Sequence, residues 1–496
     1  MIKNWQSHKK YLHFLKHCKA RMDSSQRIRW RELRPIRKRL KSLNLDAAGV
    51  FMFPLYSSTG RPALNQPQIL RSFILWFLLF RQGLVKLSLT EWVEKLKRDE
   101  LYSNLIGCSS GSSPPLGSYY DFIDRLWAAP LSDWYSRNKT FPSNKNKSKP
   151  KKPKGKGEKA SEKKSNITRR IADRFLAGKD GHLNHQILLQ KFFFLVAVLP
   201  SLECGLIPKK KLVLSGDGTA LHAHASSYGH SRPSLNPAFR HFSDPDADWG
   251  WDSDLEKYYF GYTLYHLSIY NKDIKTDLPL FLRLFNARRH DSVSFLLTYK
   301  EFKDCSPGIS VRDLCLDSAH DNYPTYELLL HDKIRPLIDL NKNRGRPTSL
   351  PAELKIDTDG TPVCQAGRRM VFWGNCGSRY RTKWRCPVAV GRCDSCPCPC
   401  SDSPYGRVIY TKPDWDIRLY TPVPRGTALY RKIYKNRTCT ERVNNRILND
   451  YGLHSLVVHS ARRYSFILMV IGICIQLSMT NYLLCIGLCT NPLLNP

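Results

Sequence analysis

The spacing of hydrophobic and polar residues separates a helical first part of the chain from a strand-rich middle part. Apolar positions recur at helical intervals after a polar, proline-containing entry at 65–67, and again over 87–107, where Thr90 is the expected N-cap. A further short helix is expected over 116–127. The N-terminal region is therefore predicted to be a basic helical domain, without a clear helix-turn-helix pattern.

From residue 211 the pattern changes to short apolar runs bounded by polar turns, which predict strands. The first run is KKLVLSGDG, expected to end at Asp217, and the next two, GYTLYHLSIYN and LPLFLRLFNAR, are expected to form a hairpin. A helix over HDSVSFLLTYKEF, with Asp291 or Ser292 as its N-cap, precedes the strand VRDLCLD, the helix YPTYELLLHD and the strand IRPLIDL. This order is typical of an α/β, RNase H-like fold, in which the first and fourth strands are neighbours.

Two aspartates at predicted strand ends and one glutamate on a later helix form the candidate active site. Asp217 closes the first strand, Asp317 closes the apolar run LCL of the fourth, and Glu441 follows a long insertion over 341–431. Carboxylate oxygens are the ligands that hard divalent cations prefer. A pair of such cations about 3.5–4 Å apart stabilises both the attacking and the leaving oxygen in phosphodiester cleavage. The pattern therefore predicts a nuclease or strand-transferase site.

Each carboxylate also has an ordinary structural interpretation. Asp217 would suit a turn at a strand end, and Glu441 would suit the exposed surface of a helix. Asp313 and Asp321 are local rivals of Asp317, since the first lies inside the strand and the second stands where the following helix needs a cap. Asp317 is preferred because it lies at the strand end, where a shared metal site would form.

The segment YKNRTCTERVNNRILNDYGL places aromatic, basic and acidic residues at helical spacing. At 100° per residue, Tyr434, Arg437, Glu441 and Leu448 fall within roughly 60° of one helix face. Together with the two aspartate segments it resembles the DDE transposases of bacterial insertion sequences, in the branch with a Tyr-x2-Arg-x3-Glu-x6-Lys signature. Leu448 stands where that signature has lysine, and Arg446 is the nearby residue expected to supply the missing DNA contact.

The resemblance extends from about Tyr56 to the C-terminal region, and it includes a GRP-containing helix entry and the LKRD segment at 96–99. It implies a transposase that cleaves DNA at the ends of its element and joins the 3′-hydroxyls to target DNA. It also implies Mg²⁺ or Mn²⁺ on the three carboxylates, and phosphate contacts by the tyrosine and arginine of the signature. A homodimer in the DNA complex and a cytoplasmic, nucleoid-associated location are further expectations of the resemblance.

The formal net charge of +36 points to a polyanionic partner. The low-complexity segment 144–165 contributes ten lysines and two glutamates, so most of the excess charge lies elsewhere in the chain. Neutralising phosphates releases condensed counterions, which makes double-stranded DNA the expected partner and a membrane surface the competing one. The segment itself is predicted to be a disordered linker that also contacts DNA.

Sixteen cysteines in a chain without a visible secretion signal argue against a disulfide framework. Cys393 and Cys396 have a zinc-knuckle spacing, and Cys386 and Cys400 are natural third and fourth ligands. We expect a structural Zn²⁺ to order this insertion without taking part in catalysis, since thiolates would fill every coordination position. The alternative is an irregular loop of reduced, unligated thiols.

Only the stretch 465–489 approaches the composition of a membrane span, and polar residues interrupt it after about ten apolar positions. A buried core helix is the expected structure, and no membrane association is expected. The four residues 344–347, Arg-Gly-Arg-Pro, match a minor-groove hook and equally a simple loop.

These expectations combine into an RNase H-like catalytic core with a Cys-rich insertion, preceded by an all-helical N-terminal domain. The predicted divisions are an N-terminal DNA-binding domain (1–143), a basic linker (144–166), the first part of the core (167–340), the insertion (341–431) and the helical C-terminal part of the core (432–496). One alternative is a catalytically inactive, zinc-stabilised DNA-binding protein derived from a transposase. The other is a membrane-associated basic protein.

Overall fold

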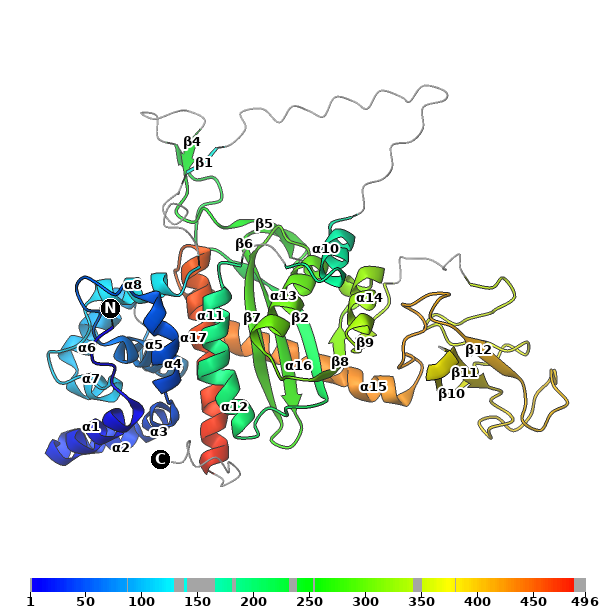
Figure 1. Cartoon of the computed structure of the whole chain (residues 1–496), viewed down its shortest axis with the longest axis horizontal. Coiled ribbons are helices and arrows are strands. Elements are labelled where there is room, and N and C mark those ends of the chain that lie inside the picture. The colour runs from blue at the N-terminus through cyan, green and yellow to red at the C-terminus, as the bar shows by residue number, and fades with distance from the viewer. Residues whose placement is uncertain are drawn as a thin grey trace.

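The computed structural model describes residues 2–86, 88–128, 138–140, 166–180, 184–231, 239–252, 255–341, 350–379 and 381–485. The predicted linker, apart from Asn166, and the segment 344–347 lie outside these ranges, so both stay predictions. Along the described chain a helical region is followed by a mixed sheet with helices and by a small Cys-rich sheet (Figure 1). The protein is thus a mixed α/β protein.

Short helices make up most of the N-terminal region. They are α1 (His8–Arg21), α2 (Ser24–Glu32), α3 (Arg34–Ser42), α4 (Asp46–Met52), η1 (Phe53–Leu55), α5 (Gln66–Arg81), α6 (Leu89–Arg98), α7 (Glu100–Ile106) and α8 (Leu116–Arg125). The three predicted helical segments are confirmed by α5, by α6 with α7, and by α8. Thr90 is not the N-cap, because Ser88 caps α6 through reciprocal hydrogen bonds with Glu91.

A short strand and further helices occupy the interval before the central sheet. β1 (Asn138–Thr140) pairs with β4 (Phe239–His241), which pairs with β3 (His230–Ser231), so the N-terminal region is mainly rather than wholly helical. The helices are α10 (Ile167–Leu176), α11 (Ile187–Phe193), the π-helical η2 (Phe194–Val198) and α12 (Leu199–Glu203).

A mixed sheet forms the centre of the molecule. Its strands are β2 (Leu212–His222), β5 (Asp248–Asp252), β6 (Lys257–Asn271), β7 (Thr276–Asn286), β8 (Val311–Leu316) and β9 (Arg335–Ile338). The order is β7-β6-β2-β8-β9, with β5 paired beside the first residues of β6. β7, β6 and β2 are antiparallel neighbours, whereas β8 and β9 run parallel to β2. The predicted pairing of the first and fourth strands is confirmed.

Helices pack on both faces of this sheet. They are α13 (Asp291–Cys305), η3 (Ser318–His320), α14 (Tyr323–His331), α15 (Ala428–Tyr434), η6 (Lys435–Arg437), α16 (Thr438–Asn445), the π-helical η7 (Arg446–Asp450) and η8 (Leu453–Ser455). Neighbouring positions on β2 face opposite sides. Asp217 lies beside Thr440 of α16, whereas Gly218 lies beside the first residue of α13. The N-cap of α13 is His290, not Asp291 or Ser292.

The long apolar helix α17 (Ala461–Cys485) joins the N-terminal helices to the sheet. It stands between them in Figure 1 and packs on β7 on one side and on α5 and α3 on the other. Among the described residues it is the one helix that is long and apolar enough to cross a membrane, yet 78% of its most apolar window is buried inside the protein. It therefore has the surroundings expected of a core helix.

The cysteines of the insertion lie beside a small sheet of its own. β10 (Val371–Cys376), β11 (Arg381–Arg385) and β12 (Val408–Thr411) form this antiparallel sheet, with η5 (Gly377–Arg379) between the first two strands. Residues 386–407 connect β11 to β12. Met370, Trp384 and Cys364 form a local apolar cluster that is separate from the main core.

A buried ion network attaches the end of the insertion to the central sheet. The Arg418 guanidinium lies 3.3 Å from Asp321 Oδ2 and 3.0 Å from Asp416 Oδ2, and both carboxylates are fully buried. Asp321 also accepts the main-chain N–H of Asn341 at 2.9 Å. Asp321 is therefore not the cap of α14; that cap is Asn322.

Replacing Arg418 with methionine should destabilise the protein by about 3 kcal/mol, because the change leaves two buried carboxylates without their cation. The denaturant concentration at half-unfolding measures this loss, with Arg431→Met on the exposed side of α15 as the control. An unchanged midpoint in Arg418→Met would show that the network contributes nothing to stability.

Candidate functional site

Asp217 and Asp317 lie at the same height on adjacent parallel strands. β2 and β8 pair residue 213 with 313, 214 with 314 and 215 with 315. Both aspartates stand two positions beyond the last of these pairs, at the centre of the sheet. The register of one parallel pair therefore brings together two carboxyls that are separated by a hundred residues in sequence.

Asp217 does not end its strand, contrary to the prediction. β2 continues to His222 and pairs with β6 along this whole stretch, with Asp217 opposite His266. What ends near Asp217 is the pairing with β8, whose last strand residue is Leu316. One side of β2 is thereby left open at Asp217, where a carboxyl on the next strand end can approach it.

Asp317 affects the ionisation of Asp217. Burial, and after it the neighbouring charge of Asp317, raises the pKa of Asp217 to about 7. Burial also opposes ionisation of Asp317, but the hydrogen bond and charge of His320 hold the pKa of Asp317 below its usual value. A carboxyl with a raised pKa beside one with a lowered pKa favours the binding of a cation between them.

His320 is a site residue that the sequence pattern did not reveal. Its Nδ1 lies 2.5 Å from Asp317 Oδ1, and its Nε2 lies 2.9 Å from the hydroxyl of Tyr265. Burial alone would lower the pKa of His320, but the bond to Asp317 raises it. Two fixed partners hold the ring in the core, so His320 orients Asp317. Its position three residues after a strand-end aspartate was the available signal.

Asp291 approaches the same carboxyls from the opposite face of the sheet. A Cβ added at Gly218 would lie 2.5 Å from Asp291 Oδ1, so only glycine leaves room for this carboxylate. Burial is the first cause that raises the pKa of Asp291, and the charge of Asp317 adds to it. The sequence interpretation treated Asp291 only as a helix cap; the glycine opposite it could not be placed before the fold was known.

The end of η6 brings Arg437 to the site, and α16, which follows directly, brings Glu441. Arg437 Nη2 donates to Glu441 Oε1 at 2.8 Å, and the Glu441 side chain remains 56% exposed. Burial opposes the charge of Arg437, but the neighbouring carboxylates of Asp217, Glu441 and Asp317 raise its pKa. Thr440, whose hydroxyl lies 3.4 Å from Asp217 Oδ2, completes this side of the site.

The remaining residues of the signature face elsewhere. The Tyr434 hydroxyl lies 3.0 Å from the carbonyl of Leu316 and 2.8 Å from Asp339 Oδ2, which anchors the helix at the strand ends. Arg446 donates to the main-chain carbonyl of Asp277 at 2.9 Å and so faces β7. Arg446 is therefore already engaged with the sheet and is not positioned beside Arg437.

Leu448 departs from the predicted helix face. It is only 7% exposed and belongs to the main core. The run from 428 to 450 is not a uniform α-helix, since η6 is a tighter 3₁₀ turn and η7 is a wider π turn. The π turn changes the phase of the helix, so a rotation of 100° per residue no longer applies at Leu448.

The donor sets predicted for metals are only partly assembled. Among the residues that the structure describes, no three His, Cys, Asp or Glu side chains form a group that could hold a metal ion. Asp217 and Asp317 adjoin, and the effect of Asp317 on the pKa of Asp217 fits a cation between them. Glu441 pairs with Arg437 instead.

The proposed zinc ligands do not converge either. Cys386, Cys393, Cys396 and Cys400 are half-buried free thiols in the β11–β12 connection. The Cys396 thiol lies 3.2 Å from the carbonyl of Cys398. As placed, these residues do not fit a tetrahedral site, and the structural Zn²⁺ stays a prediction.

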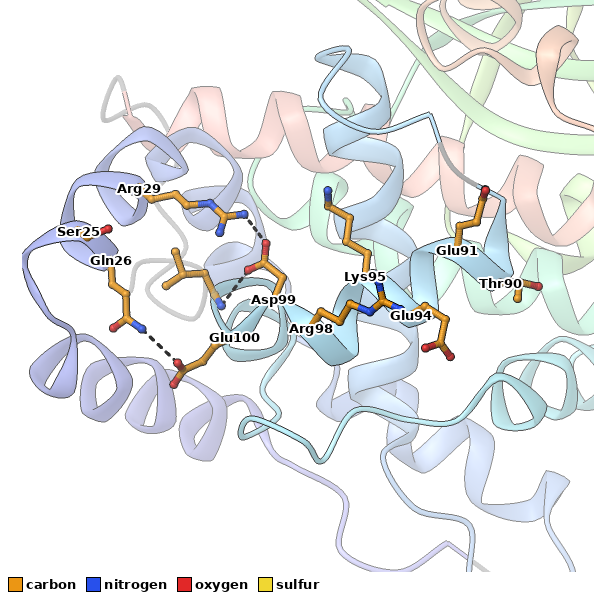
Figure 2. Close-up of a pocket in the computed structure, with 11 residues that line it drawn as sticks. Ser25, Gln26, Arg29, Thr90, Glu91, Glu94, Lys95, Arg98, Asp99 and Glu100 are labelled. Atoms are coloured by element: carbon orange, nitrogen blue, oxygen red, sulfur yellow. Dashed lines mark hydrogen bonds and ion pairs between the residues drawn. The ribbon is translucent and has the colours of Figure 1, made fainter.

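A groove between α2 and the α6–α7 corner is a further concave surface, with a volume of about 820 Å³. Figure 2 shows Arg29 directed at Asp99 across it, and Gln26 directed at Glu100. Gln26 Nε2 donates to Glu100 Oε2 at 3.1 Å. Its walls carry both acidic and basic side chains, so the groove does not present the concentrated positive charge that a phosphate backbone requires.

No protein-family model matches the sequence. No curated protein matches it at a significant level either. Any function assigned to the chain therefore rests on its own residues and their geometry.

Proposed function

We propose that the chain is a DDE transposase with an RNase H-like core, which cleaves double-stranded DNA at the ends of an insertion sequence and transfers strands to target DNA. The observation that carries this proposal is the placement of Asp217 and Asp317 at one height on adjacent parallel strands, with Arg437 and Glu441 on the helix beside them. The strand order β7-β6-β2-β8-β9, with three antiparallel strands followed by two parallel ones, supports the RNase H-like assignment.

In this proposal Arg437 binds the scissile phosphate. Its planar guanidinium suits two parallel hydrogen bonds to phosphate oxygens, and it lies within the electrostatic influence of both aspartates. The phosphate takes the place of the Glu441 carboxylate on Arg437, which frees Glu441 to become a ligand. His320 keeps Asp317 oriented meanwhile through the bond at Nδ1.

Asp217, Asp317 and, once released, Glu441 are the proposed ligands of Mg²⁺ or Mn²⁺. When bound, such ions lower the pKa of water and stabilise the charge on the leaving oxygen. The basic N-terminal helices are proposed to bind the element's ends, and two copies of the chain to pair those ends. The net charge of +36 supports DNA as the partner.

The test uses the full-length protein and labelled DNA that spans the boundary between the gene's flanks and any inverted repeats. We expect cleavage at the repeat boundary with Mg²⁺ or Mn²⁺, none with Ca²⁺, and none after chelation. A nuclease contaminant is excluded by requiring that cleavage and the protein co-elute from a sizing column. Specific DNA binding without cleavage under any metal would contradict an active transposase.

The second candidate is a catalytically inactive DNA-binding protein of the same origin. One observation favours it: Glu441 is engaged by Arg437 rather than directed at the aspartates. Under this alternative the Arg437–Glu441 pair persists in the DNA complex, and binding is independent of divalent cations. The assay with Mg²⁺, Mn²⁺ or Ca²⁺, and after chelation, distinguishes the two candidates.

A further inference from the structure

The first residue of α13, Asp291, carries a carboxylate that forms no hydrogen bond or ion pair with any of the described residues. The helix does not use it as a cap, since His290 Nδ1 accepts the main-chain N–H of Ser292 at 3.2 Å. The residue is partly buried, yet neither of its carboxylate oxygens is fully enclosed by protein, so a ligand can reach them. A carboxylate in these surroundings is unfavourable unless a donor or a cation joins it.

A favourable interaction with the helix dipole is the ordinary explanation for an aspartate in a first turn. It is worth about 0.3–1 kcal/mol and needs only an exposed position. It does not explain the space that β2 leaves for the carboxylate. A Cβ at Gly218 would lie 2.5 Å from Asp291 Oδ1, and Gly218 has an ordinary strand conformation, so its backbone alone does not require glycine.

The beginning of α13 is held between the two aspartate segments of the site. On one side, the residue that follows Asp217 lies against the Asp291 carboxylate. On the other side, the Ser292 hydroxyl donates to the carbonyl of Ala319 at 2.7 Å, two residues after Asp317. The same helix end is therefore fixed to both strands that carry the candidate metal ligands, and the carboxylate of its first residue lies between them.

Three carboxyls thus gather where only two can bind one ion directly. Burial raises the pKa of Asp217, and the charges of Asp317 and Asp291 raise it further. Among the described residues, no three acidic side chains converge on a single metal position. Mg²⁺ commonly takes one or two carboxylates and keeps several of its waters. A third carboxylate at this distance therefore suits a bound water of the ion rather than the ion itself.

We propose that Asp291 accepts a hydrogen bond from a water of the hydrated divalent cation held by Asp217 and Asp317, and is thereby a positioning residue for that cation. A group that orients a metal ligand contributes a factor of about 10–100 to metal affinity. This role of Asp291 rests on the proposed function, which brings the cation to the site.

The test follows the binding of Mn²⁺ to the full-length protein without DNA, through the electron paramagnetic resonance signal of the free ion. Binding that is lost in Asp317→Asn identifies the site. Asp291→Asn should weaken this binding about tenfold, because the amide carries no charge. Its denaturation midpoint without Mn²⁺ should stay near that of the unchanged protein, whereas a purely structural residue would change the midpoint and leave the affinity alone. Asp304→Asn, at the exposed end of α13, is the control and should bind normally.

Gly218→Ala gives an independent test that removes no charge. The added methyl group displaces the Asp291 carboxylate, so Mn²⁺ binding should again weaken about tenfold. The double variant with Asp291→Asn should be about tenfold weaker, not about a hundredfold, because both changes remove the same interaction.

Three outcomes would overturn the proposal. The first is an Asp291→Asn protein that binds Mn²⁺ as tightly as the unchanged protein. The second is an additive double variant, which would show that Gly218→Ala acts on Asp217 independently of Asp291. The third is the absence of any Mn²⁺ binding that depends on Asp317. If Gly218→Ala does not fold, Asp291→Asn decides alone.

Cleavage of labelled DNA, measured in parallel, distinguishes failure of this role from failure of the proposed function. Mn²⁺ binding that weakens in Asp291→Asn, without cleavage by the unchanged protein, supports the role of Asp291 and contradicts the transposase activity. Cleavage by the unchanged protein, together with undiminished Mn²⁺ affinity in Asp291→Asn, supports the activity and contradicts the role of Asp291.

Discussion

Strand cleavage is expected to fall by about a thousandfold or more when Asp317 is replaced with asparagine. A carboxylate that holds a catalytic cation contributes several kcal/mol to stabilising the transition state, and each 1.36 kcal/mol corresponds to a factor of ten in rate. Asparagine keeps an oxygen that can accept from His320 Nδ1 and from the main-chain N–H of Ala319, the two bonds that hold Asp317 now. The substitution therefore removes charge while preserving the local structure.

The measurement compares the rate of cleavage and the affinity for the same labelled DNA in the two proteins. Affinity should stay near that of the unchanged protein, because most of it comes from basic residues elsewhere. Asp304→Asn, on the exposed end of α13, is the matched control and should cleave normally. Full cleavage by Asp317→Asn would remove Asp317 from the site and leave Asp217 without its proposed partner.

Restoring the lysine of the transposase signature, Leu448→Lys, is expected to destabilise the protein by about 4 kcal/mol or more and to add no activity. Burial in an apolar environment shifts the pKa of a lysine by about 3–5 units, and each unit is 1.36 kcal/mol. Leu448 is 7% exposed and packs in the main core, so an ammonium there would lose its water without gaining a partner.

Chemical denaturation measures this loss, and the cleavage assay shows whether any activity is gained. Asn449→Lys adds the same charge at the next, exposed position and should leave the midpoint nearly unchanged. A Leu448→Lys protein with normal stability and faster cleavage would mean that residue 448 turns outward toward DNA. That result would contradict the π-helical phase of η7.

The strand pattern of the core was predictable because it depends on local alternation. Apolar runs such as VRDLCLD and LPLFLRLFNAR have few conformations that bury them, so β8 and β7 appear where the sequence predicts them. Positions of caps were less predictable, since Ser88 displaced Thr90, and His290 displaced Asp291. Adjacent polar residues compete for the same few N–H groups, and tertiary contacts decide between them.

The site was predictable only in part, for a reason that particular residues make clear. Asp217 and Asp317 could be paired from the strand order alone. Leu448 could not be placed, because a π turn changes the helix phase there, and the contact of Arg446 with the Asp277 carbonyl depends on the position of β7. Arg446 contacts β7, and Leu448 packs in the main core, so both positions depend on residues that are distant in sequence.

By itself the sequence determined the basic character of the chain, the order of its strands and the types of residue available at the site, because composition and alternation are local properties. Only the tertiary structure decided that His320 orients Asp317 and that Gly218 makes room for Asp291. It also decided that Glu441 rests on Arg437. The Gly218–Asp291 contact joins elements far apart in the chain. The other two pairs are only three and four residues apart, but their geometry follows from the 3₁₀ turn after β8 and from helix phase, which packing of the whole core sets.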